Sequence, residues 1–244
     1  MRANRFAQMF SFIVMSTIKI LTHIFYKFEV KWLSEKQFKQ LDNVKLVVLL
    51  NHTSLYEALF VRLAPFSFLW RIARHMLVPV ADVTTKRPLV GMFFHALVPG
   101  VVPISRKRDA SWRNFLTQIN DDSIVAILPE GRMRRHDGFD KHGKPMSVRA
   151  GVADIIEQID SGDILFVYSG GLHHIQVPGQ AIPKLFKKIK THMEVVSVDD
   201  YKDALYHPEV KNRKVAFVRD IQKRLNDLTP YCEDQPYNRK NSDI

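Results

Sequence analysis

The chain has 244 residues, which is enough for one substantial domain and too few for two large domains joined by a linker. Its 46% hydrophobic and 25% charged residues exclude a mainly disordered chain. A single cysteine, Cys232, excludes an intrachain disulfide and fits a reducing cytoplasm. The formal net charge of +11 favours a polyanionic partner such as nucleic acid, an anionic bilayer surface or a phosphorylated substrate, and does not choose among them.

The first apolar segment, residues 6–28, is long enough to be a membrane helix. Polar residues recur within it at Gln8, Ser11, Lys19 and Thr22, and these positions fall on one side of a helix. Because a lysine near the middle makes a true span costly, we expect an amphipathic helix that lies in the plane of the membrane interface.

In this interpretation residues 1–30 anchor the protein, with Arg2 and Arg5 near lipid phosphates. The alternative is a helix that packs on the protein's own core. Residues 31–229 would then form one domain, and residues 230–244 a polar C-terminal tail.

Short apolar runs alternate with amphipathic segments along the rest of the chain, which predicts a single α/β domain with a mostly parallel or mixed sheet flanked by helices. The expected strands are residues 45–50, 101–105, 123–128, 163–168 and 193–198. The expected helices are residues 55–63, 89–97, 110–120, 148–159 and 211–228. Functional side chains are expected where the strands end.

The first polar cluster follows the strand at residues 45–50 and contains His52 and Glu57. Five residues apart on one continuous helix they would point about 140° apart, so they meet only if His52 lies in the loop before the helix. A carboxylate that holds one imidazole nitrogen leaves the other free to accept a proton from a hydroxyl. The pair is therefore a candidate general base, although a histidine at a strand end is often only structural.

Two further clusters lie at predicted strand ends. Residues 100–106 run from Gly100 to Arg106, and residues 128–131 form a Leu-Pro-Glu-Gly turn that contains Glu130 and Gly131. Arginines follow this turn, and guanidinium groups bind phosphate in a bidentate manner. Taken alone, Arg106 is more typical of a solvated surface charge than of a ligand. The Glu130 turn and the arginines after it indicate a phosphate-binding arrangement at a strand end.

Four ordered segments, residues 51–57, 100–106, 128–131 and 164–168, resemble the sequence blocks of the 1-acylglycerol-3-phosphate and glycerol-3-phosphate acyltransferase family. The likeness covers about residues 46–171. It implies an O-acyltransferase that moves an acyl group from acyl-coenzyme A or an acyl carrier protein to a lysophospholipid hydroxyl in phospholipid biosynthesis. It also implies a glycerol-3-phosphate acyltransferase-like fold. From the N-terminal apolar segment and the single cysteine, we expect the protein at the cytoplasmic face of a membrane.

By position, the resemblance makes His52 the catalytic base and Glu57 its orienting acid. The substrate-binding residues that it implies are Asn51, Ser54, Gly100, Arg106, Glu130, Gly131, Arg132 and Arg134. Backbone N–H groups of the turn at residues 51–54, or a nearby cation, would stabilise the oxyanion of direct acyl transfer.

The sequence departs from the family pattern at two places. Glu57 replaces the usual aspartate, and Arg132, Met133 and Arg134 occupy the positions that usually read Thr-Arg-Ser. The default acceptor is 1-acyl-sn-glycerol-3-phosphate, and the second departure leaves another polar lipid as an alternative. A catalytically degenerate lipid-binding protein is the other alternative.

Three remaining patterns bear on partners and cofactors. Residues 136–142 hold two histidines and two aspartates without a recognised metal spacing, and no nucleotide loop is present, so we expect neither a metal nor a cofactor besides the acyl donor. No signature of a nucleic-acid-binding module accompanies the positive charge. Residues 184–190 mix lysines with large apolar side chains, which fits either an anionic lipid interface or a solvated surface.

Overall fold

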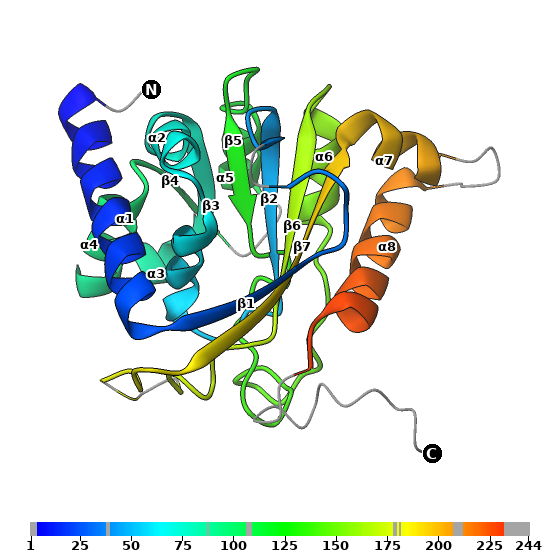
Figure 1. The fold of residues 1–244 in the computed structure, drawn as a ribbon. Helices are drawn as coiled ribbons and strands as arrows, with labels where there is room; N and C mark the ends of the chain where they lie inside the picture. Colours follow the sequence, from blue (N-terminus) through cyan, green and yellow to red (C-terminus); the bar gives the residue numbers. More distant parts are fainter. Residues whose placement is uncertain are drawn as a thin grey trace, which may run out of the picture.

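The computed structural model describes residues 4–37, 40–86, 88–105, 109–177, 180, 182–206 and 212–231. It contains one α/β domain built on a mixed seven-stranded sheet with the order β1-β7-β6-β2-β5-β3-β4 (Figure 1). The strands are β1 (Lys27–Trp32), β2 (Val44–Leu50), β3 (Met76–Ala81), β4 (Gly100–Ile104), β5 (Ile124–Ile127), β6 (Asp163–Ser169) and β7 (Lys188–Ser197). The helices are α1 (Arg5–Phe25), the 3₁₀ helix η2 (Leu55–Leu63), α2 (Phe66–His75), α3 (Asp82–Thr85), α4 (Pro88–Leu97), α5 (Ala110–Leu116), α6 (Gly151–Gln158), α7 (Val198–Leu205) and α8 (Arg213–Leu228). The predicted fold class is confirmed.

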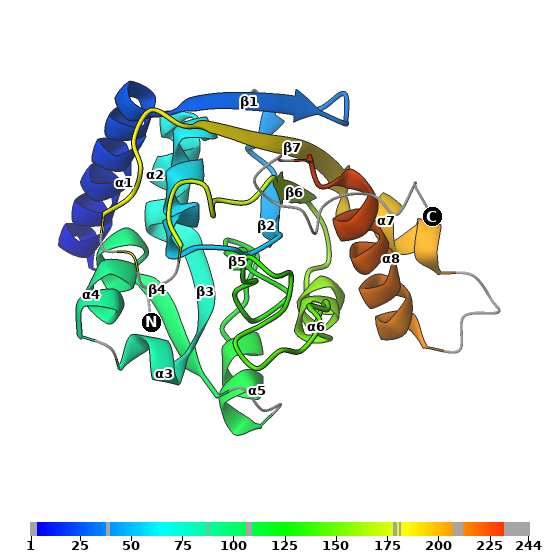
Figure 2. The ribbon, with the colours of Figure 1, turned by 90° about the horizontal axis from the view of Figure 1, so that it is seen from below.

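Each face of the sheet packs against its own set of helices, as Figure 2 shows from below. Alternate residues of β2 point to opposite faces, so that Leu46, Val48 and Leu50 join one core and Val47 joins the other. The core that contains Val47 packs under α1, η2 and α2, whereas the other lies under α5, α6 and α8. Burial on both faces explains why the central strands are continuous apolar runs.

Strands β6, β2, β5, β3 and β4 run parallel, and β7 runs antiparallel to β6. The carboxyl ends of β2, β5 and β6 therefore lie at the same edge, with Leu50 opposite Tyr168 and Val48 opposite Ile127. The polar segments that follow Leu50, Ile127 and Ser169 meet there.

Several elements differ from those that the sequence predicts. The helix expected over residues 6–28 ends at Phe25, and the boundary placed at residue 30 falls within β1. Strand β7 begins five residues earlier than expected, at Lys188. Strand β3 was not predicted and contains Pro79, which cannot donate a backbone hydrogen bond. Strand β3 pairs with β5 only through Met76 and Leu77. The pairing with β5 therefore does not need the hydrogen-bond donor that Pro79 lacks.

Helix α1 lies along the domain with its polar side facing inward. The Ser11 hydroxyl donates to the Leu97 carbonyl, and the Lys19 ammonium donates to the carbonyls of Arg62 and Ala64. The opposite side exposes large apolar residues, namely Phe6, Met9, Phe10, Ile13, Ile20, Leu21 and Ile24. Among the described residues, α1 is also the one helix whose length and composition would allow it to cross a membrane.

Candidate active site

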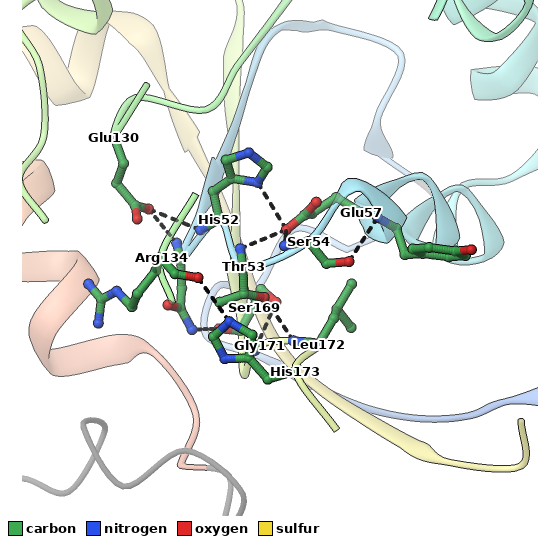
Figure 3. A network of polar contacts seen from close by, with 12 residues as sticks. His52, Thr53, Ser54, Glu57, Glu130, Arg134, Ser169, Gly171, Leu172 and His173 are labelled. Carbon is green, nitrogen blue, oxygen red and sulfur yellow. Dashed lines mark hydrogen bonds and ion pairs between the residues drawn. The ribbon is translucent and has the colours of Figure 1, made fainter. Parts of the chain in front are cut away.

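The turn after β2 begins at Asn51, whose backbone is in the left-handed region with φ of 66°. Asparagine tolerates this conformation better than most residues. The Asn51 backbone N–H donates to Glu130 Oε1 at 2.6 Å, and the Asn51 side-chain amide donates to the Ser169 carbonyl at 2.8 Å. These bonds join the ends of β2, β5 and β6 and aim the next residue, His52, out of the strand direction (Figure 3).

The imidazole Nδ1 of His52 lies 3.1 Å from Glu57 Oε1. The same carboxylate oxygen accepts the backbone N–H groups of Thr53 and Ser54, both at 2.9 Å. Ser54 is the N-cap of η2, and its hydroxyl oxygen accepts the backbone N–H of Tyr56. It also forms a capping box with Glu57, in which the Ser54 oxygen accepts the Glu57 N–H and the Glu57 carboxylate accepts the Ser54 N–H. His52 therefore lies before the helix and Glu57 in its first turn, the geometry that the sequence predicts for contact between them.

The protonation of His52 depends on two opposing effects. Burial disfavours the imidazolium, but the negative charges of Glu57 and Glu130 outweigh it and raise the pKa of His52 above its ordinary value. The side chain keeps an exposed fraction of 17%. Since Nδ1 faces Glu57, the second ring nitrogen, Nε2, is the atom that can exchange a proton with a substrate.

Glu130 follows β5 and is almost fully buried. Its Oε1 also lies 3.3 Å from the His52 backbone N–H, which donates to it, so that one carboxylate oxygen receives two successive N–H groups of the turn. Burial raises the pKa of Glu130, although Arg134, His52 and these two N–H groups act in the opposite direction. Glu130 Oε2 has no hydrogen-bond partner among the described residues. Contact of Glu130 with a substrate stays a prediction.

The segment after Glu130 bends back toward the histidine turn. Gly131 has φ of 64°, a conformation that glycine adopts readily, and its N–H donates to the Leu128 carbonyl at 3.0 Å. The Arg134 N–H then donates to the His52 carbonyl at 2.7 Å. The third predicted cluster is thereby hydrogen-bonded directly to the first.

The two predicted arginines differ in their surroundings. Arg132 forms an ion pair with the buried Asp140, whose pKa is lowered to about 2 by hydrogen bonds from the backbone of Lys144 and His142 and from Arg132. Arg134 lies close enough to Glu130 to lower the pKa of that carboxyl. Arg134 is thus the arginine nearer to the His52 turn, both through its backbone and through its charge.

The segment after β6 supports the site, and sequence reasoning missed it. The Leu172 N–H donates to the Thr53 hydroxyl at 2.8 Å, and the Ser54 hydroxyl donates to Gln176 Oε1 at 2.8 Å. His173 Nε2 lies 2.8 Å from the Arg134 carbonyl. The available signal was the sequence Ser-Gly-Gly at the end of a buried strand, since it marks a turn at the edge where the other clusters lie.

The structure does not bring one predicted residue, Gly100, to this site. Gly100 begins β4, at the opposite end of that strand from the edge that carries His52. A Cβ atom there would come within 2.0 Å of the Met76 carbonyl oxygen, so that the close approach of β3 and β4 requires glycine. Arg106 lies outside the described residues, as does Cys232.

No protein-family model matches the chain, and no curated protein matches its sequence. Among solved structures, the chain is similar to the crystal structure of PlsC, the 1-acyl-sn-glycerophosphate acyltransferase from Thermotoga maritima. The identity is 18% and the TM-score 0.50, over 86% of this chain and 78% of that chain. At this level of identity the likeness establishes the α/β fold that the two proteins share.

Proposed function

We propose that this protein is an O-acyltransferase that esterifies the hydroxyl of a lysophospholipid with an acyl group from a thioester. The observation that carries the proposal is the contact between His52 Nδ1 and Glu57 Oε1, at the sheet edge where three strand ends meet. The four sequence segments that resemble the acyltransferase blocks and the fold shared with PlsC support the same reaction.

In the proposed reaction the acceptor hydroxyl gives its proton to His52 Nε2 while its oxygen attacks the thioester carbonyl. The tetrahedral oxyanion is stabilised by N–H groups or a cation beside the turn. When the intermediate collapses, the carbon–sulfur bond breaks and the thiolate takes the proton back from His52. The products are a phospholipid ester and a free thiol, and the protein carries no covalent intermediate.

The proposed acceptor carries a phosphate, with 1-acyl-sn-glycerol-3-phosphate as the default. Arg134 is the stronger candidate for binding this phosphate, because its backbone N–H donates to the His52 carbonyl and its charge lies close to Glu130. Asn51, Ser54 and Gly131 shape the turn beside the acceptor. The donor is acyl-coenzyme A or an acyl carrier protein, and no other cofactor or nucleic acid takes part.

We place the protein at the cytoplasmic face of a membrane, with α1 in the plane of the interface. A spanning α1 would draw η2, α2 and α4 into the bilayer, since the helix packs against all three. An in-plane α1 instead turns its exposed apolar side to lipid and keeps Ser11 and Lys19 bonded to the domain.

Incubation of the purified protein with labelled acyl-coenzyme A and a panel of lysophospholipids in vesicles tests the proposal. We expect a labelled phospholipid product, formed fastest with 1-acyl-sn-glycerol-3-phosphate. The second candidate function is a lipid-binding protein without turnover, which the replacement of the usual aspartate by Glu57 favours. Tight binding of lysophospholipid with no product from either acyl-coenzyme A or acyl carrier protein would establish that function instead.

A further inference from the structure

The segment of residues 182–187, which we call the basic apolar loop, exposes three large apolar side chains. Ile182 and Phe186 have exposed fractions of 76% and 75%, and Leu185 of 44%. Scattered single apolar residues are ordinary on a protein surface, but three within five residues form a patch. Lys184 and Lys187 are exposed between and beside them.

The backbone holds this loop in place. Phe186 has φ of 58°, a left-handed conformation that is unfavourable for a bulky residue. Its N–H donates to the Phe25 carbonyl at 2.8 Å, and the rings of Phe25 and Phe186 lie 5.8 Å apart in an edge-to-face arrangement. The fold therefore fixes an exposed phenylalanine against the last turn of α1 at a conformational cost.

The loop continues the apolar side of α1. Both ribbon views show it beside the C-terminal end of that helix, where Ile20, Leu21 and Ile24 are exposed (Figures 1 and 2). Lys27, Lys184 and Lys187 are exposed in the same segments, and Lys188 is exposed and forms an ion pair with Glu29. Large apolar side chains next to exposed cations in the sequence match an anionic bilayer, in which acyl chains lie beneath a layer of phosphates.

The loop is also tied to the candidate site. The Lys184 N–H donates to the Ile175 carbonyl, and the neighbouring Gln176 accepts the hydroxyl of Ser54, the cap of the helix that carries Glu57. Two hydrogen-bonded steps thus connect the loop to the turn of His52.

We propose that the basic apolar loop is a second membrane contact, which inserts Ile182 and Phe186 into the head-group layer of an anionic bilayer beside α1. One in-plane helix leaves the domain able to rotate about the helix axis. A second contact removes this freedom and fixes the edge that carries His52 at a constant distance from the lipid. The inference requires binding alone, not acyl transfer.

Cosedimentation of the full chain with vesicles, without donor or acceptor, tests the apolar contact. In the variant Ile182→Ser/Phe186→Gly the glycine relieves the left-handed backbone, so that thermal unfolding should show a folded protein. We expect affinity for vesicles of phosphatidylcholine and phosphatidylglycerol to fall about tenfold. The matched control is Val215→Ser, which changes an exposed apolar residue of α8. This variant should bind vesicles as the wild type does.

Charge reversal tests the lipid chemistry. Lys184→Glu/Lys187→Glu should weaken binding roughly tenfold on vesicles with phosphatidylglycerol and leave binding to pure phosphatidylcholine unchanged. Arg219→Glu/Lys223→Glu on α8 changes the net charge equally and should have a much smaller effect.

Wild-type affinity in both loop variants would overturn the inference and assign the loop to a protein partner or to solvent. Equal losses in the loop and α8 charge variants would also overturn it, because they would reveal attraction to the net charge alone. Loop-dependent binding by a protein that transfers no acyl group would contradict only the proposed function.

Discussion

At the scale of single residues, Glu57 does two tasks with one oxygen atom. Its Oε1 contacts His52 Nδ1 and accepts two backbone N–H groups at the start of η2. The position is the third of the helix, where glutamate or glutamine can reach back to the cap. The capping box therefore accommodates a glutamate where the acyltransferase blocks that this segment resembles carry the shorter aspartate.

Substitution Glu57→Gln keeps an oxygen for the two N–H groups and removes the negative charge, so it separates orientation from electrostatics. His52 acts as a base only when neutral, and its raised pKa places the acid limb of activity above the ordinary histidine value. We expect the acid limb of kcat/KM to move to lower pH in Glu57→Gln, with a lower plateau. Glu57→Asp keeps the negative charge and should retain the acid limb of the wild type. Identical pH profiles of kcat/KM for the wild type and both variants would refute the electrostatic role of Glu57.

Asn51 gives a test based on stability. Because its φ is 66°, Asn51→Gly should be more stable than Asn51→Ala by about 1 kcal/mol, although alanine is normally the better tolerated of the two. Both variants lose the amide bond to Ser169, so this loss cancels in the comparison. Urea unfolding of the two proteins measures the difference, and the usual order, with alanine more stable, would show that the turn relaxes.

The sequence predicts the contact of His52 with Glu57 because both belong to one short local motif. It does not predict that Glu130 accepts the N–H of Asn51, since 79 residues separate them and the bond depends on strand order. The supports at Leu172 and Gln176 lie still further along the chain and carry no side-chain chemistry that marks them as part of a site. The placement of Gly100 likewise follows from the packing of two strands.

At the scale of elements, α1 is amphipathic with its polar side against the protein. The periodicity of Gln8, Ser11, Lys19 and Thr22 predicts the two sides of the helix, but only the tertiary structure shows which side faces the domain. The strands β1 and β3 were missed for a similar reason. Strand β1 alternates charged and apolar residues at the sheet edge, and its pairing with β7 joins segments about 160 residues apart.

A matched pair of substitutions tests the orientation of α1. Ile20→Ser changes the exposed side and should weaken vesicle binding several-fold with little effect on unfolding. Lys19→Met removes the ammonium that donates to Arg62 and Ala64 and should lower the free energy of unfolding by about 1.5 kcal/mol without weakening vesicle binding. The opposite pattern would mean that Lys19 faces lipid.

At the scale of the whole molecule, the sheet carries the candidate site, and a polar network fixes α8 to strands β6 and β7. Arg224 contacts Glu194 on β7 and Asp220 on α8, both at 2.6 Å, and these carboxylates accept the hydroxyls of Tyr168 and Tyr201. The guanidinium also lies 5.2 Å from the centre of the Phe166 ring. These contacts join β6 and β7 to α8.

Removal of this central cation should destabilise the fold without altering chemistry at His52. We expect Arg224→Met to lose about 2 kcal/mol of unfolding free energy, because two partly buried carboxylates lose their shared partner. Chemical denaturation measures the loss. The single-turnover rate at a temperature where the variant is folded should match that of the wild type, and a rate reduced tenfold would link the network to the site.

The central claim is that His52 takes the proton from an acceptor hydroxyl, and the rate of acyl transfer by His52→Ala tests it most directly. With labelled acyl-coenzyme A or acyl carrier protein, and lysophospholipid vesicles, we predict that the wild type forms product and that His52→Ala loses roughly a thousandfold in rate. The control His95→Ala, at an exposed position on α4, should keep the wild-type rate. Undiminished transfer by folded His52→Ala would contradict the account.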